Sequence, residues 1–175
     1  MVCTSLTEFR IPNSLQNLGQ DAFAKCTSLT TFIVSFECEN YCAIDGALYS
    51  KDASVLMVWP QGRTDVNISE TTETIGFSSF GEFKNLGNVA LPNSVKRIES
   101  FAFNNCENLE EVKLSDSLGF LGQGSFYSCS SLESIELPNA LAFLHWIVFD
   151  SCSSLKTMNI PASVVEIMGG SAFRN

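Results

Sequence analysis

The stretch LPNSVKRIESFAFNNCENL, from Leu91 to Leu109, decides the fold because the chain repeats much of it elsewhere. From Ile11 to Leu29 the chain reads IPNSLQNLGQDAFAKCTSL. The two lines share a proline, an Asn-Ser pair, an Ala-Phe pair and a cysteine at the same positions. Self-similarity at a fixed period is the sequence signature of a repeat protein.

Leucine, phenylalanine and cysteine columns all repeat with a period of 23 residues. The columns hold Leu86, Leu109, Leu132 and Leu155; Phe80, Phe103, Phe126 and Phe149; and Cys106, Cys129 and Cys152. Leu6 and Leu29 keep the same interval, as do Cys3 and Cys26. A coil of this length cannot bury both of its ends alone, so it has to stack on its neighbours. The period therefore predicts a solenoid.

Each coil begins with a short strand. In Leu109 to Leu114, Val112 and Leu114 alternate with Glu111 and Lys113, which places the apolar pair inward and the charged pair outward. A proline, which cannot donate a backbone hydrogen bond, ends this strand in four coils. These prolines are Pro12, Pro92, Pro138 and Pro161. A second apolar pair then leads into a turn. No stretch keeps helical spacing for three turns, so the fold is mostly β with short turns and little α-helix.

These columns resemble the BspA-like leucine-rich repeat family, whose units follow LxxIxIPxSVxxIxxxAFxxCxxL. The resemblance covers nearly the whole chain. It implies a leucine-rich repeat solenoid, a right-handed superhelix. It also implies a non-catalytic protein interaction or adhesion module of a cell-surface or secreted protein. We expect the partner to be a protein or other macromolecule, either basic or from the extracellular matrix.

One segment, Ser35 to Gly62, breaks the period. Asp45-Gly46 lies between Tyr41 to Ile44 and Ala47 to Ser50, which predicts a hairpin with a type I′ turn. Val55 to Trp59 supplies a further strand. The segment 35–62 is therefore predicted to be a β-meander inserted into the stack.

The chain of 175 residues lies within the range of a single domain, and its 45% apolar content can fill one continuous core. We expect one domain over residues 1–175. No polar cap is visible at either end, and solenoids normally close their ends with such caps. We therefore expect the chain to be an excerpt of a longer protein. The longest apolar run, Ala140 to Phe149, is too short to span a bilayer.

The seven cysteines divide into two groups. Five fall in the repeat column, which needs a small buried apolar side chain, so they are expected to be buried and reduced. They are Cys3, Cys26, Cys106, Cys129 and Cys152. Cys38 and Cys42 lie outside the repeat, and the sequence leaves open whether they are free, form a disulfide or bind zinc.

Enzyme chemistry finds little support in the sequence. The single histidine, His145, occupies a turn column that holds glycine in other coils, so a loop imidazole is favoured over a catalytic base. The sequence predicts no cofactor and no metal. A net charge of −9 argues against nucleic acid and against an anionic membrane surface.

The outward face of the first strand carries an acidic cluster on two adjacent coils. The acidic cluster consists of Glu110, Glu111, Glu133 and Glu136. Two interpretations are open: a solvated face that keeps the protein soluble, or a binding site for a basic partner.

A second candidate surface, the aromatic flank, lies on the opposite side. Phe120 and Phe143 fill a column that holds Arg97 and Glu166 in other coils, and Trp146 is nearby. Exposed aromatic side chains on adjacent coils would mark an interface, whereas a neighbouring turn could equally cover them.

The sequence thus predicts an interaction module that binds a macromolecule through its strand face. The alternative is a structural spacer in a longer surface protein, with no direct ligand. Tyr41, Tyr49 and Trp59 form a third candidate surface, since the repeat itself does not require the insert that carries them. The oligomeric state is not indicated.

Overall fold

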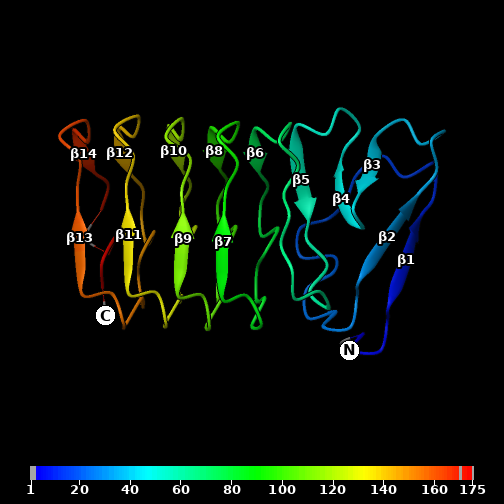
Figure 1. Cartoon of the computed structure of the whole chain (residues 1–175), viewed down its shortest axis with the longest axis horizontal. Coiled ribbons are helices and arrows are strands. Elements are labelled where there is room, and N and C mark those ends of the chain that lie inside the picture. The colour runs from blue at the N-terminus through cyan, green and yellow to red at the C-terminus, as the bar shows by residue number, and fades with distance from the viewer. Residues whose placement is uncertain (1–2, 170, 175) are drawn as a thin grey trace.

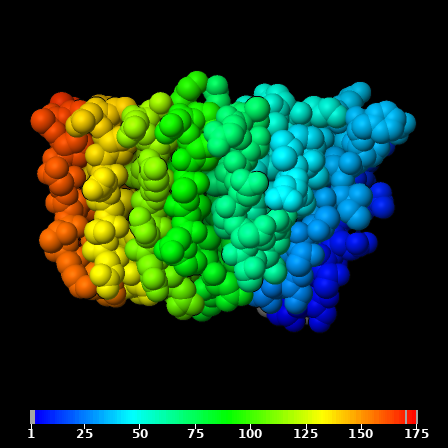
Figure 2. Space-filling view, in the orientation of Figure 1, coloured from blue at the N-terminus to red at the C-terminus, as the bar shows by residue number. Residues whose placement is uncertain are grey.

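The computed structural model describes residues 3–169 and 171–174. Short strands and turns form coils that stack side by side along the long axis, so the chain is a β-solenoid (Figure 1). The space-filling view shows the same coils as parallel slabs running in chain order from one end to the other (Figure 2). No helix occurs in the described residues.

The first strands of six coils form the first ladder, which consists of three separate parallel pairs. The pairs are β1 (Glu8–Ile11) with β2 (Thr31–Val34), β7 (Asn88–Ala90) with β9 (Glu111–Lys113), and β11 (Ser134–Glu136) with β13 (Thr157–Asn159). Val89 lies opposite Val112, one 23-residue period later. Glu111 and Lys113 are exposed whereas Val112 is buried, which confirms the predicted alternation.

A second ladder of two-residue strands runs along the stack where the sequence predicted an apolar pair that leads into a turn. It contains β6 (Thr74–Ile75), β8 (Arg97–Ile98), β10 (Phe120–Leu121), β12 (Phe143–Leu144) and β14 (Glu166–Ile167). Ile98 and Leu121 are fully buried. Two residues are too few to show a period of two, so only the stacking of coils reveals these strands.

The segment after β2 folds as three antiparallel strands, β3 (Tyr41–Ile44), β4 (Ala47–Ser50) and β5 (Val55–Val58). Asp45 and Gly46 have φ values of 48° and 76°, as a type I′ turn requires, so the predicted hairpin is confirmed. β5 then pairs in parallel with β6. The meander is therefore continuous with the second ladder rather than a separate appendage.

A row of stacked aromatic rings runs through the core. It contains Trp59, Phe80, Phe103, Phe126, Phe149 and Phe173, with neighbouring ring centroids 4.8–5.9 Å apart and planes within 18° of parallel.

Trp59 enters this row from the insert. Its amide donates to the carbonyl of Ser79, just as the amide of Phe80 donates to the carbonyl of Ala102. Trp59 and Tyr49 are both fully buried, and Tyr41 is 5% exposed. The hypothesis that these side chains form a surface that the repeat does not require is therefore wrong, because Trp59 occupies the place of a repeat phenylalanine.

The repeat cysteines are buried, with one exception. The thiols of Cys106, Cys129 and Cys152 each donate to the carbonyl of a core phenylalanine at 3.0–3.1 Å. Burial raises the pKa of the Cys106 thiol to about 12. Cys3 is exposed, contrary to expectation, because it lies in the outermost coil and has a neighbouring coil on one side only.

The two cysteines of the insert are both free thiols. Cys38 is fully buried. Cys42 is partly buried, and its thiol donates to the carbonyl of Ser50 at 3.1 Å. In the described residues the two therefore form no disulfide.

Native-state alkylation is expected to label Cys3 rapidly and to spare Cys106, Cys129 and Cys152. All three thiols are buried and therefore shielded from the reagent, and burial also raises the pKa of Cys106, so that this thiol supplies little of the reactive thiolate. Mass spectrometry of the alkylated protein, before and after denaturation, measures this. Rapid labelling of Cys106 in the folded protein would contradict the register of the coils.

Candidate functional site

The structure brings the four glutamates of the acidic cluster together. Glu111 lies on β9 and Glu136 on β11, and these two strands run side by side (Figure 1). Glu110 immediately precedes β9, and Glu133 immediately precedes β11. All four side chains are exposed. They line two adjoining hollows, one containing Glu110, Glu111 and Glu133 and the other containing Glu111 and Glu136.

These hollows lie at a break in the first ladder. β9 pairs with β7 and β11 pairs with β13, but β9 and β11 are not hydrogen-bonded neighbours. The second ladder is interrupted between the same two coils, at β10 and β12. On the turn side the coils stay bonded, since the amide of Phe126 donates to the carbonyl of Val148 at 3.0 Å. Between these two coils, the strands are therefore not hydrogen-bonded to each other, whereas the turns are.

The acidic cluster carries a net negative charge. Glu133 forms an exposed ion pair with Lys156 at 2.9 Å. Over residues 3–169 and 171–174, Glu110, Glu111 and Glu136 form no ion pair within 4 Å. Like charges gathered on neighbouring strands focus a negative potential, which attracts cationic groups.

The sequence had identified the four glutamates but contained no signal for the break. The leucine, phenylalanine and cysteine columns continue through both coils without interruption. Nothing in the period distinguishes this pair of coils from any other.

The aromatic flank is divided between covered and exposed side chains. The Arg97 guanidinium lies 4.0 Å from the centre of the Phe120 ring, and the His145 ring lies 5.1 Å from it. Phe120 is therefore partly covered. Phe143 and Trp146 are 41% and 58% exposed. The flank lies beside the second ladder, so it is a different surface from the acidic cluster.

The described part of the chain contains neither a metal-binding cluster nor a membrane-spanning helix. Its His, Cys, Asp and Glu side chains form no group of three or more that could hold a metal ion. Its secondary structure also includes no helix with the length and apolar character needed to cross a membrane.

Comparison with known proteins found a matching family model and similar solved structures. The model, described as the BspA type leucine rich repeat region, matches six copies over residues 1–44 and 62–175. The unmatched residues, 45–61, belong to the meander and include its strands β4 and β5. Comparison with curated protein sequences found no match.

The solved structures are bacterial repeat proteins. The pneumococcal vaccine antigen PcpA is 23% identical with a TM-score of 0.71, covering 94% of this chain and 51% of that one. A leucine rich cell surface protein from Faecalibacterium prausnitzii is 32% identical with a TM-score of 0.65, and the match covers 97% of this chain and 39% of that one. A leucine-rich repeat protein from Eubacterium ventriosum is 23% identical with a TM-score of 0.57, and the match covers 97% of this chain and 59% of that one. The chain thus spans about half the length, or less, of the first two.

Proposed function

Because the chain belongs to the BspA-type leucine-rich repeat family, we propose that it is a non-catalytic interaction module of a cell-surface or secreted protein. Its partner is a basic protein that docks on the acidic cluster. Stacked repeats form extended surfaces that solenoid proteins use for binding. A cell-surface location is supported by the similarity to the leucine rich cell surface protein from Faecalibacterium prausnitzii.

One observation carries the proposal: three glutamates without ion pairs gather where the strand ladder is open. Some carboxylates elsewhere on the stack are paired, for example Glu73 with Lys96 and Glu107 with Lys84, each at 2.9 Å. A partner with lysines and arginines would supply the missing countercharges. Its contacts would add mainly to the association rate and to specificity.

Changing Glu111 and Glu136 together to Gln is expected to slow association with the basic partner and to flatten its salt dependence. The melting temperature should stay the same or rise slightly, because like-charge crowding on adjacent strands is relieved. A pull-down from extracellular matrix and cell lysate, at low and high salt, first supplies the partner. Surface plasmon resonance then measures association rates for both proteins.

The matched control is Glu8→Gln with Glu70→Gln, which makes the same change in net charge at exposed positions outside the cluster. If both double variants slow association equally, overall charge rather than the acidic cluster drives binding. If binding survives in both but disappears on Phe143→Ser with Trp146→Ser, the aromatic flank is the active surface.

The structural spacer is the second candidate function, favoured by the unbroken row of stacked rings that makes the coils one elongated body. It predicts that the pull-down captures no partner specifically at either salt concentration.

A further inference from the structure

Exposed large apolar side chains gather at the two ends of the described stack. Phe36, which is 89% exposed, lies in the loop after β2, near the first coil. The others lie in the last two coils: Phe143, Trp146, Ile160, Val165, Ile167 and Phe173. In Figure 2 the segment between β2 and β3 projects at the N-terminal end, and the last coil lies at the opposite end. The stack thus has an aromatic knob, Phe36, at one end and apolar surface at the other.

Hydrogen bonds fix the loop that carries the knob. The ammonium group of Lys51 donates to the carbonyl of Phe36 at 2.9 Å and also to the carbonyl of Cys38. The amide of Cys38 donates to the carbonyl of Ser35 at 3.0 Å, and the Cys38 side chain is fully buried. A preorganised loop loses little further freedom on binding, so an exposed aromatic ring on it is suited to anchor a contact.

A hollow of about 190 Å³ lies in the last coil, at the end of the stack opposite to the knob. Apolar side chains form most of its wall: Phe149, Cys152, Leu155, Met158 and Phe173. Phe173 is 40% exposed and Met158 is partly exposed, so the hollow is open to solvent. A cavity of about 150 Å³ between apolar side chains holds one benzene ring. The hollow therefore has room for the ring of one phenylalanine.

The charges beside the knob and the hollow have opposite signs. Glu37 and Glu39 follow Phe36 in the same loop, and both are exposed. Lys156 lines the hollow, and its side chain is 68% exposed. Lys156 pairs with Glu133 at 2.9 Å, but exposed ion pairs contribute little stability, so a second carboxylate can approach it at little cost. A phenylalanine ring docked in the hollow would bring its neighbouring carboxylates toward this ammonium group.

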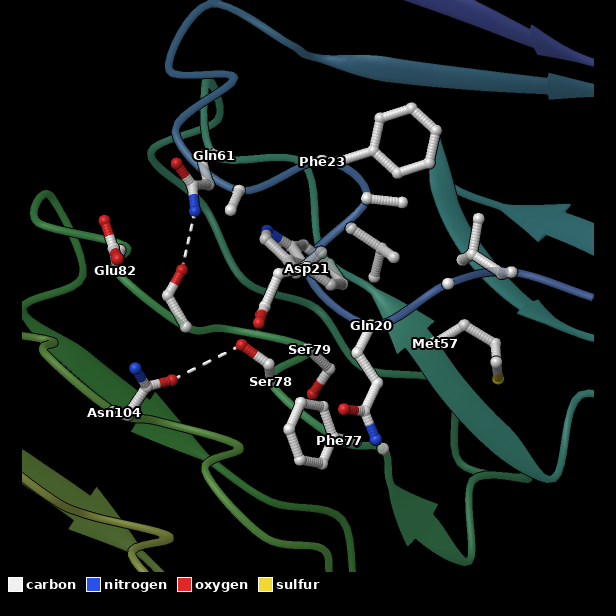
Figure 3. A pocket seen from close by; sticks show the side chains of 18 of the residues that line it. Gln20, Asp21, Phe23, Met57, Gln61, Phe77, Ser78, Ser79, Glu82 and Asn104 are labelled. Carbon is white, nitrogen blue, oxygen red and sulfur yellow. Dashed lines mark hydrogen bonds between the residues drawn. The ribbon is translucent and has the colours of Figure 1, made fainter. Parts of the chain in front are cut away.

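A second recess, the insert pocket, suits the knob less well. It lies where the insert joins the stack (Figure 3), and its volume is about 140 Å³. Asp21 and Glu82 contribute to its lining. Their carboxylates would repel the two glutamates beside Phe36, because like charges disfavour an approach. The hollow in the last coil is therefore the better match in both size and charge.

We propose that the chain associates with a second copy of itself head to tail, with the Phe36 ring of one copy inserted into the hollow of the next. A knob that fits a hollow elsewhere on the same molecule makes a heterologous contact, which does not close on itself unless a rotation allows it. Since the knob and the hollow lie at opposite ends of the long axis, the copies extend in a row. The acidic cluster lies between the two ends and has no part in this contact.

Methionine methyl signals and sedimentation test the contact. In protein labelled with ¹³C at its methionine methyl groups, Met158 reports on the hollow and Met57 reports on the insert pocket (Figure 3). As the protein concentration rises, sedimentation velocity is expected to show dimers and longer rows. The Met158 signal should shift over the same range, while the Met57 signal stays constant. A monomer at every concentration overturns the proposal, as does a shift of Met57 in place of Met158.

A pair of phenylalanine variants tests the knob. Phe36→Ala should keep the fold, because the ring is 89% exposed, and should weaken self-association at least about tenfold. Phe143→Ala is the matched control, since it removes an exposed ring that does not line the hollow. It should associate like the original protein. Unchanged association of Phe36→Ala would show that another surface makes the contact and would overturn the proposal.

An exchange of charges tests which groups meet across the contact. Lys156→Glu is expected to weaken self-association about two- to fivefold, because it places a carboxylate opposite Glu37 and Glu39. Adding Glu37→Lys and Glu39→Lys to this variant should restore the association. A triple variant that associates no better than Lys156→Glu alone would contradict the placement of the Phe36 loop against the hollow.

Discussion

Phe126→Ala is expected to lower the free energy of unfolding by about 3–5 kcal/mol. The Phe126 ring is fully buried between Phe103 and Phe149, with centroids 5.2 Å and 5.6 Å away. Its loss opens a cavity and interrupts the aromatic row between two coils. Chemical denaturation followed by circular dichroism measures the change.

The control for this prediction is Lys113→Ala, on the outward side of β9. Lys113 is exposed, so its replacement is expected to change stability by less than about 0.5 kcal/mol. Comparable losses in the two variants would contradict the inward and outward assignment of the repeat columns.

Trp59→Ala is expected to destabilise the protein by an amount similar to Phe126→Ala, about 3–5 kcal/mol. Trp59 stacks on Phe80 at 5.8 Å, and its other neighbours include the Arg63 guanidinium, 5.5 Å from the ring centre. It is therefore a core residue, although it belongs to the insert. The same denaturation experiment measures the effect.

Trp146→Ala is the matched control, because it removes the same side chain from a position that is 58% exposed. We expect a much smaller loss of stability there. If both tryptophan variants lose equally little unfolding free energy, the insert is attached to the stack without contributing to its core.

Together these two predictions bear on how the stack unfolds. In a solenoid each coil contacts only its neighbours, so stability is close to a sum of coil and interface contributions. A cavity at Phe126 weakens the pair of coils that is already unpaired on its strand sides, between β9 and β11. Hydrogen exchange should therefore show faster opening around these coils in Phe126→Ala than around β4.

Much of the candidate site could be predicted, but its surroundings could not. The outward direction of Glu111 and Glu136 follows from alternation along a strand, which is a local property. The partial covering of Phe120 by Arg97 and His145 involves side chains from the two neighbouring coils. Alternation does not determine which way such long side chains turn, so the sequence left both interpretations of the flank open.

The sequence by itself determined the period, the strand-and-turn architecture and the buried columns, such as that of Phe126 and Cys129. These features recur from coil to coil, so the pattern of one coil predicts that of the next. Only the tertiary structure decided that Cys3 is exposed, that Trp59 replaces a repeat phenylalanine and that the ladder opens between β9 and β11. The reason is physical: these features depend on what each coil meets at its two faces. Wherever a neighbour is missing, interrupted or replaced by the insert, the periodic rule no longer describes the contacts that the coil makes.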